Sequence, residues 1–90
     1  MGESVVRTVV VANANGVHAR PSHAIVSAAQ DFDAEVELHC DGRRADARSI
    51  LAVMTLGAAH GVEIEIRAVG VEAEAAAERI VELLAAPEPA

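Results

Sequence analysis

The sequence predicts an α+β fold, an open-faced β-sandwich in which a four-stranded antiparallel sheet is covered on one face by three helices. Segments that alternate polar and apolar residues are typical of strands with one face in water, and they favour an antiparallel sheet. Other segments repeat apolar residues at the spacing of one helix face. The elements follow the order βαββαβα, and the first six match the split βαβ arrangement of a two-layer sandwich.

Strands are expected at residues 5–11, 34–40, 43–46 and 62–67. The first is rich in β-branched valines, and the second and fourth alternate with period two. In the second strand, Val36, Leu38 and Cys40 should face the core, while the residues between them face water. The pair Asp41-Gly42 predicts a tight hairpin turn into the third strand.

A first helix is expected over residues 19–31 and a second from Ser49, which should cap it. In the second helix, the spacing predicts a core face formed by Ile50, Val53 and Met54. A third helix should follow Gly70 and end near Pro87, with the charged residues between 72 and 82 on its solvated face. Its core stripe is Ala73, Ala76, Ala77, Ile80 and Leu84.

The composition indicates one soluble globular domain over residues 1–90, with a flexible tail at 87–90. A net charge of -7 and a single aromatic residue, Phe32, argue against binding of nucleic acid or anionic membranes. The lone Cys40 excludes an intramolecular disulfide and is expected to be a buried, inert thiol. Neither a signal peptide nor a membrane-spanning run is present, so a cytoplasmic location is expected.

Residues 16–22 place a histidine, His18, directly before the first helix. Pro21 suits the first helical turn, where its missing N–H costs no hydrogen bond. The helix dipole should disfavour a charged imidazolium and leave a neutral, nucleophilic ring nitrogen on His18. The amides of Ala19 and Arg20, and the Arg20 guanidinium, would stabilise a phosphoryl group on that ring. Taken alone, however, the same short motif also fits a capped helix with a surface arginine.

A second segment decides between these interpretations. The string ARSILAVMTLG at 47–57, together with GVHARP at 16–21, closely resembles the HPr family of the bacterial phosphoenolpyruvate-dependent phosphotransferase system. The resemblance covers nearly all of the chain. It implies a phosphocarrier, not an enzyme and without a cofactor, that accepts a phosphoryl group from enzyme I on Nδ1 of His18 and passes it to enzyme IIA proteins. Arg20 would be the supporting arginine.

The resemblance also assigns a role to Ser49, as the regulatory serine that HPr kinase modifies in some lineages. Capping and phosphorylation of Ser49 are compatible, because a phosphate is tolerated at a helix N-terminus. Ile50, Leu51 and Met54 resemble the apolar docking patch of the family. The helical spacing contradicts this in part, since it sends Ile50 and Met54 to the core and leaves only Leu51 clearly exposed. We expect a monomer.

Some positions depart from the family pattern. Ser22 stands where the family usually has a small apolar residue. Many relatives carry Lys or Arg on the exposed face of the first helix, which puts the partner set of this chain in doubt. The corresponding positions here are His23, Ser27 and Gln30. His39 and His60 lack a second ligand at metal spacing, so we expect surface histidines and no metal site.

Two alternatives to a sugar-transport carrier stay open. The first is a regulatory HPr-like module that acts by binding and is switched at Ser49, although the retention of His18 argues against it. The second is a nitrogen-branch phosphocarrier with the same chemistry and signalling partners. An enzyme of the acylphosphatase kind would need an anion loop with a catalytic Arg and Asn, which the sequence lacks.

Overall fold

The structure is a computed structural model, and it describes residues 2–14, 16–17 and 19–87. Its elements are β1 (Glu3–Val10), α1 (Ala19–Gln30), β2 (Glu35–Cys40), β3 (Arg43–Asp46), α2 (Ile50–Thr55), β4 (Glu63–Gly70) and α3 (Ala73–Ala85). This is the predicted order βαββαβα. Within the described residues, no helix is both long and apolar enough to cross a membrane.

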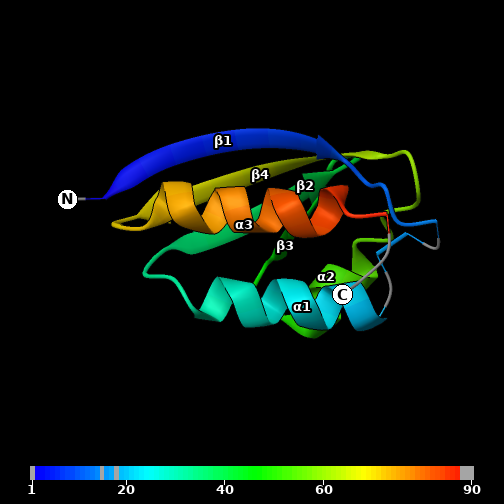
Figure 1. Cartoon of the computed structure of the whole chain (residues 1–90), viewed down its shortest axis with the longest axis horizontal. Coiled ribbons are helices and arrows are strands. Elements are labelled where there is room, and N and C mark those ends of the chain that lie inside the picture. The colour runs from blue at the N-terminus through cyan, green and yellow to red at the C-terminus, as the bar shows by residue number, and fades with distance from the viewer. Residues whose placement is uncertain (1, 15, 18, 88–90) are drawn as a thin grey trace.

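The four strands form one antiparallel sheet in the order β1-β4-β2-β3. The three helices lie on one side of it, and α3 packs on β1 and β4 (Figure 1). Helix α1 lies beside α3 and also contacts α2. The predicted open-faced sandwich is therefore confirmed.

The core lies between the sheet and the helices. Val36, Leu38 and Cys40 of β2 are buried as predicted, as is the whole predicted stripe of α3. Ile64 and Ile66 of β4 are fully buried at the centre of the sheet. Burial of one such side chain stabilises the fold by about 1.5–3 kcal/mol. Alternation along the strands therefore determines which face of the sheet receives the helices.

The β2–β3 hairpin turns at Asp41 and Gly42, which have φ values of 51° and 77°. Two consecutive positive φ values are typical of a type I′ turn, whose twist matches that of the flanking strands. Cys40 and Arg43 face each other across the turn. The Asp-Gly prediction of a tight hairpin is confirmed.

Five strand boundaries differ from the prediction: both ends of β1, the start of β2 and both ends of β4. Val11 lies outside β1, although its N–H still donates to the Val62 carbonyl oxygen at 2.9 Å in the connection before β4. Strand β4 extends to Gly70 rather than ending at residue 67, since Gly70 pairs with Glu3 of β1. Pairing with the neighbouring strand determines where each strand ends, and the composition of one strand alone does not show this.

Candidate functional site

The loop between β1 and α1 is fastened to the segment that follows α2. The Val17 N–H donates to the Ala58 carbonyl oxygen at 2.8 Å, and Val17 is buried. The Gly16 N–H donates to the Asn13 carbonyl oxygen at 3.0 Å. Gly16 has a φ of +72°, and a Cβ there would lie 2.6 Å from the same Ala58 oxygen. Only glycine fits this close approach, so Gly16 determines the path of the chain into α1.

Helix α1 begins at Ala19, directly after this loop. The predicted phosphoacceptor, His18, lies outside the described residues. The amides of Ala19 and Arg20 are in the first helical turn, where backbone N–H groups have no intrahelical acceptor. Pro21 is buried in the same turn and contributes no N–H. The start of α1 therefore offers a small number of donors and the positive end of the helix dipole.

Arg20 is exposed, and in the described part of the chain it has no ion pair or hydrogen bond. Most other arginines of the described chain bond to a glutamate or a carbonyl oxygen. An unpaired guanidinium beside a helix start can reorient toward an anion without first breaking a contact. The geometry is thus compatible with the predicted supporting role of Arg20.

Ser49 is the N-cap of α2, as predicted. Its backbone is extended, and its Oγ accepts a hydrogen bond from the Ala52 N–H at 3.2 Å. The side chain is half-buried, two residues before the exposed Leu51. The cap starts a helix of only six residues, which ends at Thr55 before Gly57.

The helical spacing predicted the core face of α2 correctly for Val53 and wrongly for Ile50 and Met54. Ile50 and Met54 are 38% and 41% exposed, and Leu51 is 74% exposed, whereas Val53 and Leu56 are buried. In one and a half turns, two overlapping apolar spacings fit equally well, and contact with the rest of the fold selects the one with Val53 and Leu56. The patch of Ile50, Leu51 and Met54 inferred from the family resemblance is therefore exposed.

Helix α2 contacts α1 and lies toward the amino end of α1 (Figure 1). The residues after α2 also carry the Ala58 carbonyl to which the loop is bonded. A partner that covers α2 would thus meet the amino end of α1. Sequence reasoning missed this link, because no local pattern relates Gly16 and Val17 to Ala58.

Among the described residues, the Cys40 thiol and the other histidines do not form a second catalytic or metal-binding site. Burial, and the nearby Asp41 carboxylate to a smaller extent, raise the pKa of the Cys40 thiol, so a neutral thiol is favoured. His39 Nε2 lies 3.0 Å from Glu37 Oε1, and His23 and His60 are exposed. In the part of the chain that the structure describes, no three His, Cys, Asp or Glu side chains are placed to hold a metal ion.

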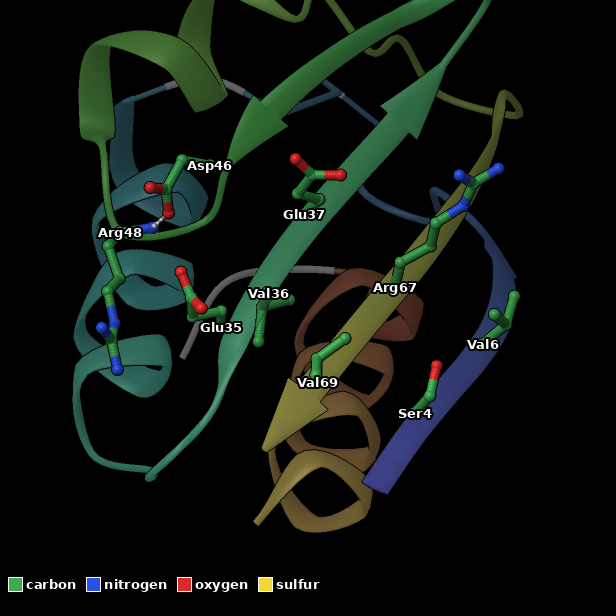
Figure 2. Close-up of a pocket in the computed structure, with 9 residues that line it drawn as sticks. All are labelled: Ser4, Val6, Glu35, Val36, Glu37, Asp46, Arg48, Arg67 and Val69. Atoms are coloured by element: carbon green, nitrogen blue, oxygen red, sulfur yellow. Dashed lines mark hydrogen bonds between the residues drawn. The ribbon is translucent and has the colours of Figure 1, made fainter. Parts of the chain in front are cut away.

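A hollow of about 420 Å³ lies on the open face of the sheet, and Figure 2 shows the residues that line it. Several of its charged groups are bonded to neighbouring groups. Asp46 Oδ1 accepts from the Arg48 N–H at 2.9 Å, and the Arg48 guanidinium donates to the Ala34 carbonyl oxygen at 2.9 Å. Arg67 pairs with Glu65. None of the predicted site residues lines this hollow.

Comparison with known proteins places the site in a family. The sequence profile described as "PTS HPr component phosphorylation site" matches residues 5–86. The chain belongs to the HPr family. The phosphocarrier protein HPr of Treponema pallidum is 48% identical to it over 62 residues, which cover 69% of this chain and 70% of that protein. The phosphocarrier protein NPr of Escherichia coli K12 is 40% identical over 81 residues, which cover 89% and 90% of the two chains.

A solved HPr structure supports the same assignment. The phosphocarrier protein HPr of Bacillus anthracis superposes with a TM-score of 0.86 at 33% sequence identity, and the match covers 90% of this chain and 96% of that one. The fold, the bonded loop and the exposed α2 patch thus belong to an HPr family phosphocarrier of the phosphotransferase system.

Proposed function

We propose that His18 is the residue that carries the phosphoryl group. The observation that supports this most strongly is the match of the HPr phosphorylation-site profile to residues 5–86, which include the loop and the helix start around His18. In this proposal, phosphorylated enzyme I donates the group and an enzyme IIA protein receives it. The chain is the substrate of its partner phosphotransferases and not itself an enzyme, and it acts as a monomer in the cytoplasm.

Each transfer forms one bond to phosphorus as another breaks. The Nδ1 lone pair of His18 attacks phosphorus while the bond to the donor group breaks, and the reverse step passes the group to the acceptor. The amides of Ala19 and Arg20 hold the phosphoryl oxygens at the amino end of α1, where the dipole favours negative charge. The Arg20 guanidinium adds a charge-assisted contact, and it is unpaired in the described structure.

The exposed residues of α2 supply the partner contact in this proposal. Leu51, Met54 and Ile50 present apolar surface on a helix that contacts α1, and a partner seated on them also meets the start of α1. Ser49 lies directly beside this patch. We therefore propose that phosphorylation of Ser49 by an HPr kinase regulates docking, and that its cap position lets the helix tolerate the phosphate.

A nitrogen-branch role is the second candidate. It is favoured by the 40% identity to the phosphocarrier protein NPr, which extends over 89% of this chain. The chemistry at His18 would be the same, and the acceptor would be a signalling protein. Incubation of the phosphorylated chain with enzyme IIA proteins of both branches, followed by intact mass of each acceptor, distinguishes the two roles.

The test of the phosphoacceptor is incubation of the purified chain with enzyme I and phosphoenolpyruvate, read by intact mass. The wild-type chain should gain one acid-labile phosphoryl group, and His18→Ala should gain none. His23→Ala is the matched control, because His23 is exposed on α1 and should not affect labelling. Undiminished labelling of His18→Ala, with an unchanged circular dichroism spectrum, would show that another residue accepts the group.

A further inference from the structure

The positive charges of this chain are few and mostly engaged. All seven basic residues are arginines, against 14 acidic residues. In the described part of the chain, Arg7, Arg67 and Arg79 pair with glutamates. Arg48 donates to the carbonyl oxygens of Phe32 and Ala34. Three arginines of the described residues, Arg20, Arg43 and Arg44, have no ion pair or hydrogen bond.

Two of the unpaired arginines are neighbours at the start of β3, beside the α2 patch. They help to line a shallow groove of about 400 Å³ between the β2–β3 hairpin and α2. The groove is formed by Arg43, Arg44, Leu51, Ala52, Thr55 and Leu56. Both arginines are exposed, and so is Leu51, so this surface combines mobile positive charge with apolar area.

Arg43 is the member of the pair that faces α2. It lies opposite Cys40 in the sheet register, and Cys40 points into the core on the helix-covered face. A Cβ placed on Gly57 would lie 3.2 Å from Arg43 Nη1, so the guanidinium rests at the end of α2. Gly57 precedes Ala58, whose carbonyl holds the loop before α1. Arg44 lies opposite His39, at the rim of the groove on the open side.

Helix α1 offers no comparable charge beyond its first turn. Its last turn has no basic residue, and Arg20 is its only arginine. The exposed side chains beyond that turn include His23, Ser27 and Gln30, none of which is Lys or Arg. On this side of the molecule, the unpaired arginines of the described residues that a partner can reach are therefore Arg43 and Arg44 at the start of β3 and Arg20 at the start of α1.

We infer that Arg43 and Arg44 form the electrostatic anchor of the partner-docking surface, and that the partner presents carboxylates beside an apolar contact for Leu51. The inference rests on the proposed function, because it takes α2 to be the docking face. A protein partner is favoured over nucleic acid, since the chain carries a net charge of -7 and the groove contains no aromatic side chain for stacking.

The test measures phosphoryl transfer from phosphorylated enzyme I to the chain as a function of chain concentration. The variants are Arg43→Gln, Arg44→Gln and the double variant. A charge at the rim of an interface mainly changes the rate at which the two proteins associate. KM for the chain should therefore rise about 3- to 10-fold in the double variant while kcat stays unchanged. Arg43→Gln should account for most of the change, because its guanidinium lies at the end of α2.

Three controls separate an anchor from a structural role. Arg79→Gln removes the same charge from the exposed face of α3 and should leave KM unchanged. Arg43→Lys keeps the charge and should restore most of the affinity. The difference between wild type and the double variant should shrink from about 0.1 M to about 1 M NaCl, where the Debye length falls from about 10 Å to about 3 Å. Melting curves for each variant report on the fold.

The failure of this inference is distinguishable from that of the proposed function. If His18 of the wild-type chain is not labelled, the proposed function is wrong and the inference falls with it. If the wild type is labelled and the double variant has the same KM at low salt, only the anchor is wrong. An equal rise of KM in Arg79→Gln would show a general effect of net charge and would also overturn the proposed anchor. Binding of a labelled oligonucleotide at physiological salt, lost in the double variant, would assign the pair to phosphate backbones instead.

Discussion

Ser22 is fully buried in α1, and its Oγ has no hydrogen-bond partner among the described residues. Buried hydroxyls without partners are rare, because the desolvation of the group is not compensated. Ser22→Ala should therefore raise the free energy of unfolding by about 1 kcal/mol. Urea unfolding followed by far-ultraviolet circular dichroism measures it, since the chain has no Trp or Tyr.

The matched control is Ser27→Ala on the exposed face of the same helix. It should change stability by only a few tenths of a kcal/mol, roughly the difference in helix propensity. Equal effects of the two substitutions would show that burial of the Ser22 hydroxyl costs nothing measurable. The sequence shows that Ser22 departs from the family pattern. It does not show the energetic consequence, because burial of the hydroxyl depends on packing around α1.

Arg20 is exposed, so its substitution should change function without disturbing the core. Arg20→Ala should slow phosphoryl transfer to and from His18 by about 10- to 100-fold, because a charge-assisted contact strengthens as charge develops in the transition state. Arg20→Lys should recover part of this loss, since it keeps the charge and loses the planar fork. Rapid-quench measurement of both directions checks the prediction, and unchanged rates in Arg20→Ala would leave Arg20 as a surface charge.

At the scale of single elements, the strands were easier to predict than α2. Period-two alternation over β2 and β4 leaves one choice of inward face, since a shift by one residue would expose every apolar side chain. Helix α2 has six residues, too few for the helical spacing to be unique. Its exposed patch was expected from the resemblance to the HPr family and not from the helical spacing.

Ser49 provides a test in which its cap role and its regulatory role give opposite results. Ser49→Ala removes the acceptor of the Ala52 N–H and should lower the free energy of unfolding by about 1 kcal/mol, while labelling of His18 continues at the wild-type rate. Ser49→Asp keeps a good N-cap and should leave the melting temperature unchanged. It places negative charge beside Leu51 and should slow labelling by enzyme I.

The labelling rate at matched protein concentration and a melting curve for each variant give the answer. A wild-type labelling rate in Ser49→Asp would mean that Ser49 acts only as a cap. A large fall in the melting temperature of Ser49→Asp would mean that the substitution acts on folding, and the labelling result would then not report on docking.

At the scale of the whole molecule, the fold was predictable and the geometry of the site only in part. The order of the elements and the buried faces of β2, β4 and α3 follow from patterns within about 10 to 15 residues along the chain. The bond from Val17 to Ala58 and the position of Arg43 at Gly57 connect segments far apart in sequence. No local pattern encodes such contacts, because they depend on how the hairpin and α2 pack.

The reactivity of the Cys40 thiol reports whether the fold opens as a whole or in parts. It is 3% exposed at the end of β2, and burial raises the pKa of its thiol, so a thiol reagent meets the reactive thiolate only after opening. If Cys40 becomes accessible only by global unfolding, a stability of about 5 kcal/mol slows labelling by about 10³- to 10⁴-fold relative to the chain in urea.

Ile66→Val tests whether that opening is global. Ile66 is fully buried and pairs with Leu38 of β2 at the centre of the sheet. Its loss of one methylene group should lower the free energy of unfolding by about 1 kcal/mol. Labelling of Cys40 should then accelerate by about 5-fold, the same factor as the change in the unfolding equilibrium. An unchanged labelling rate in a measurably destabilised Ile66→Val would show that the β2–β3 hairpin opens by itself, and with it the surface that carries Arg43 and Arg44.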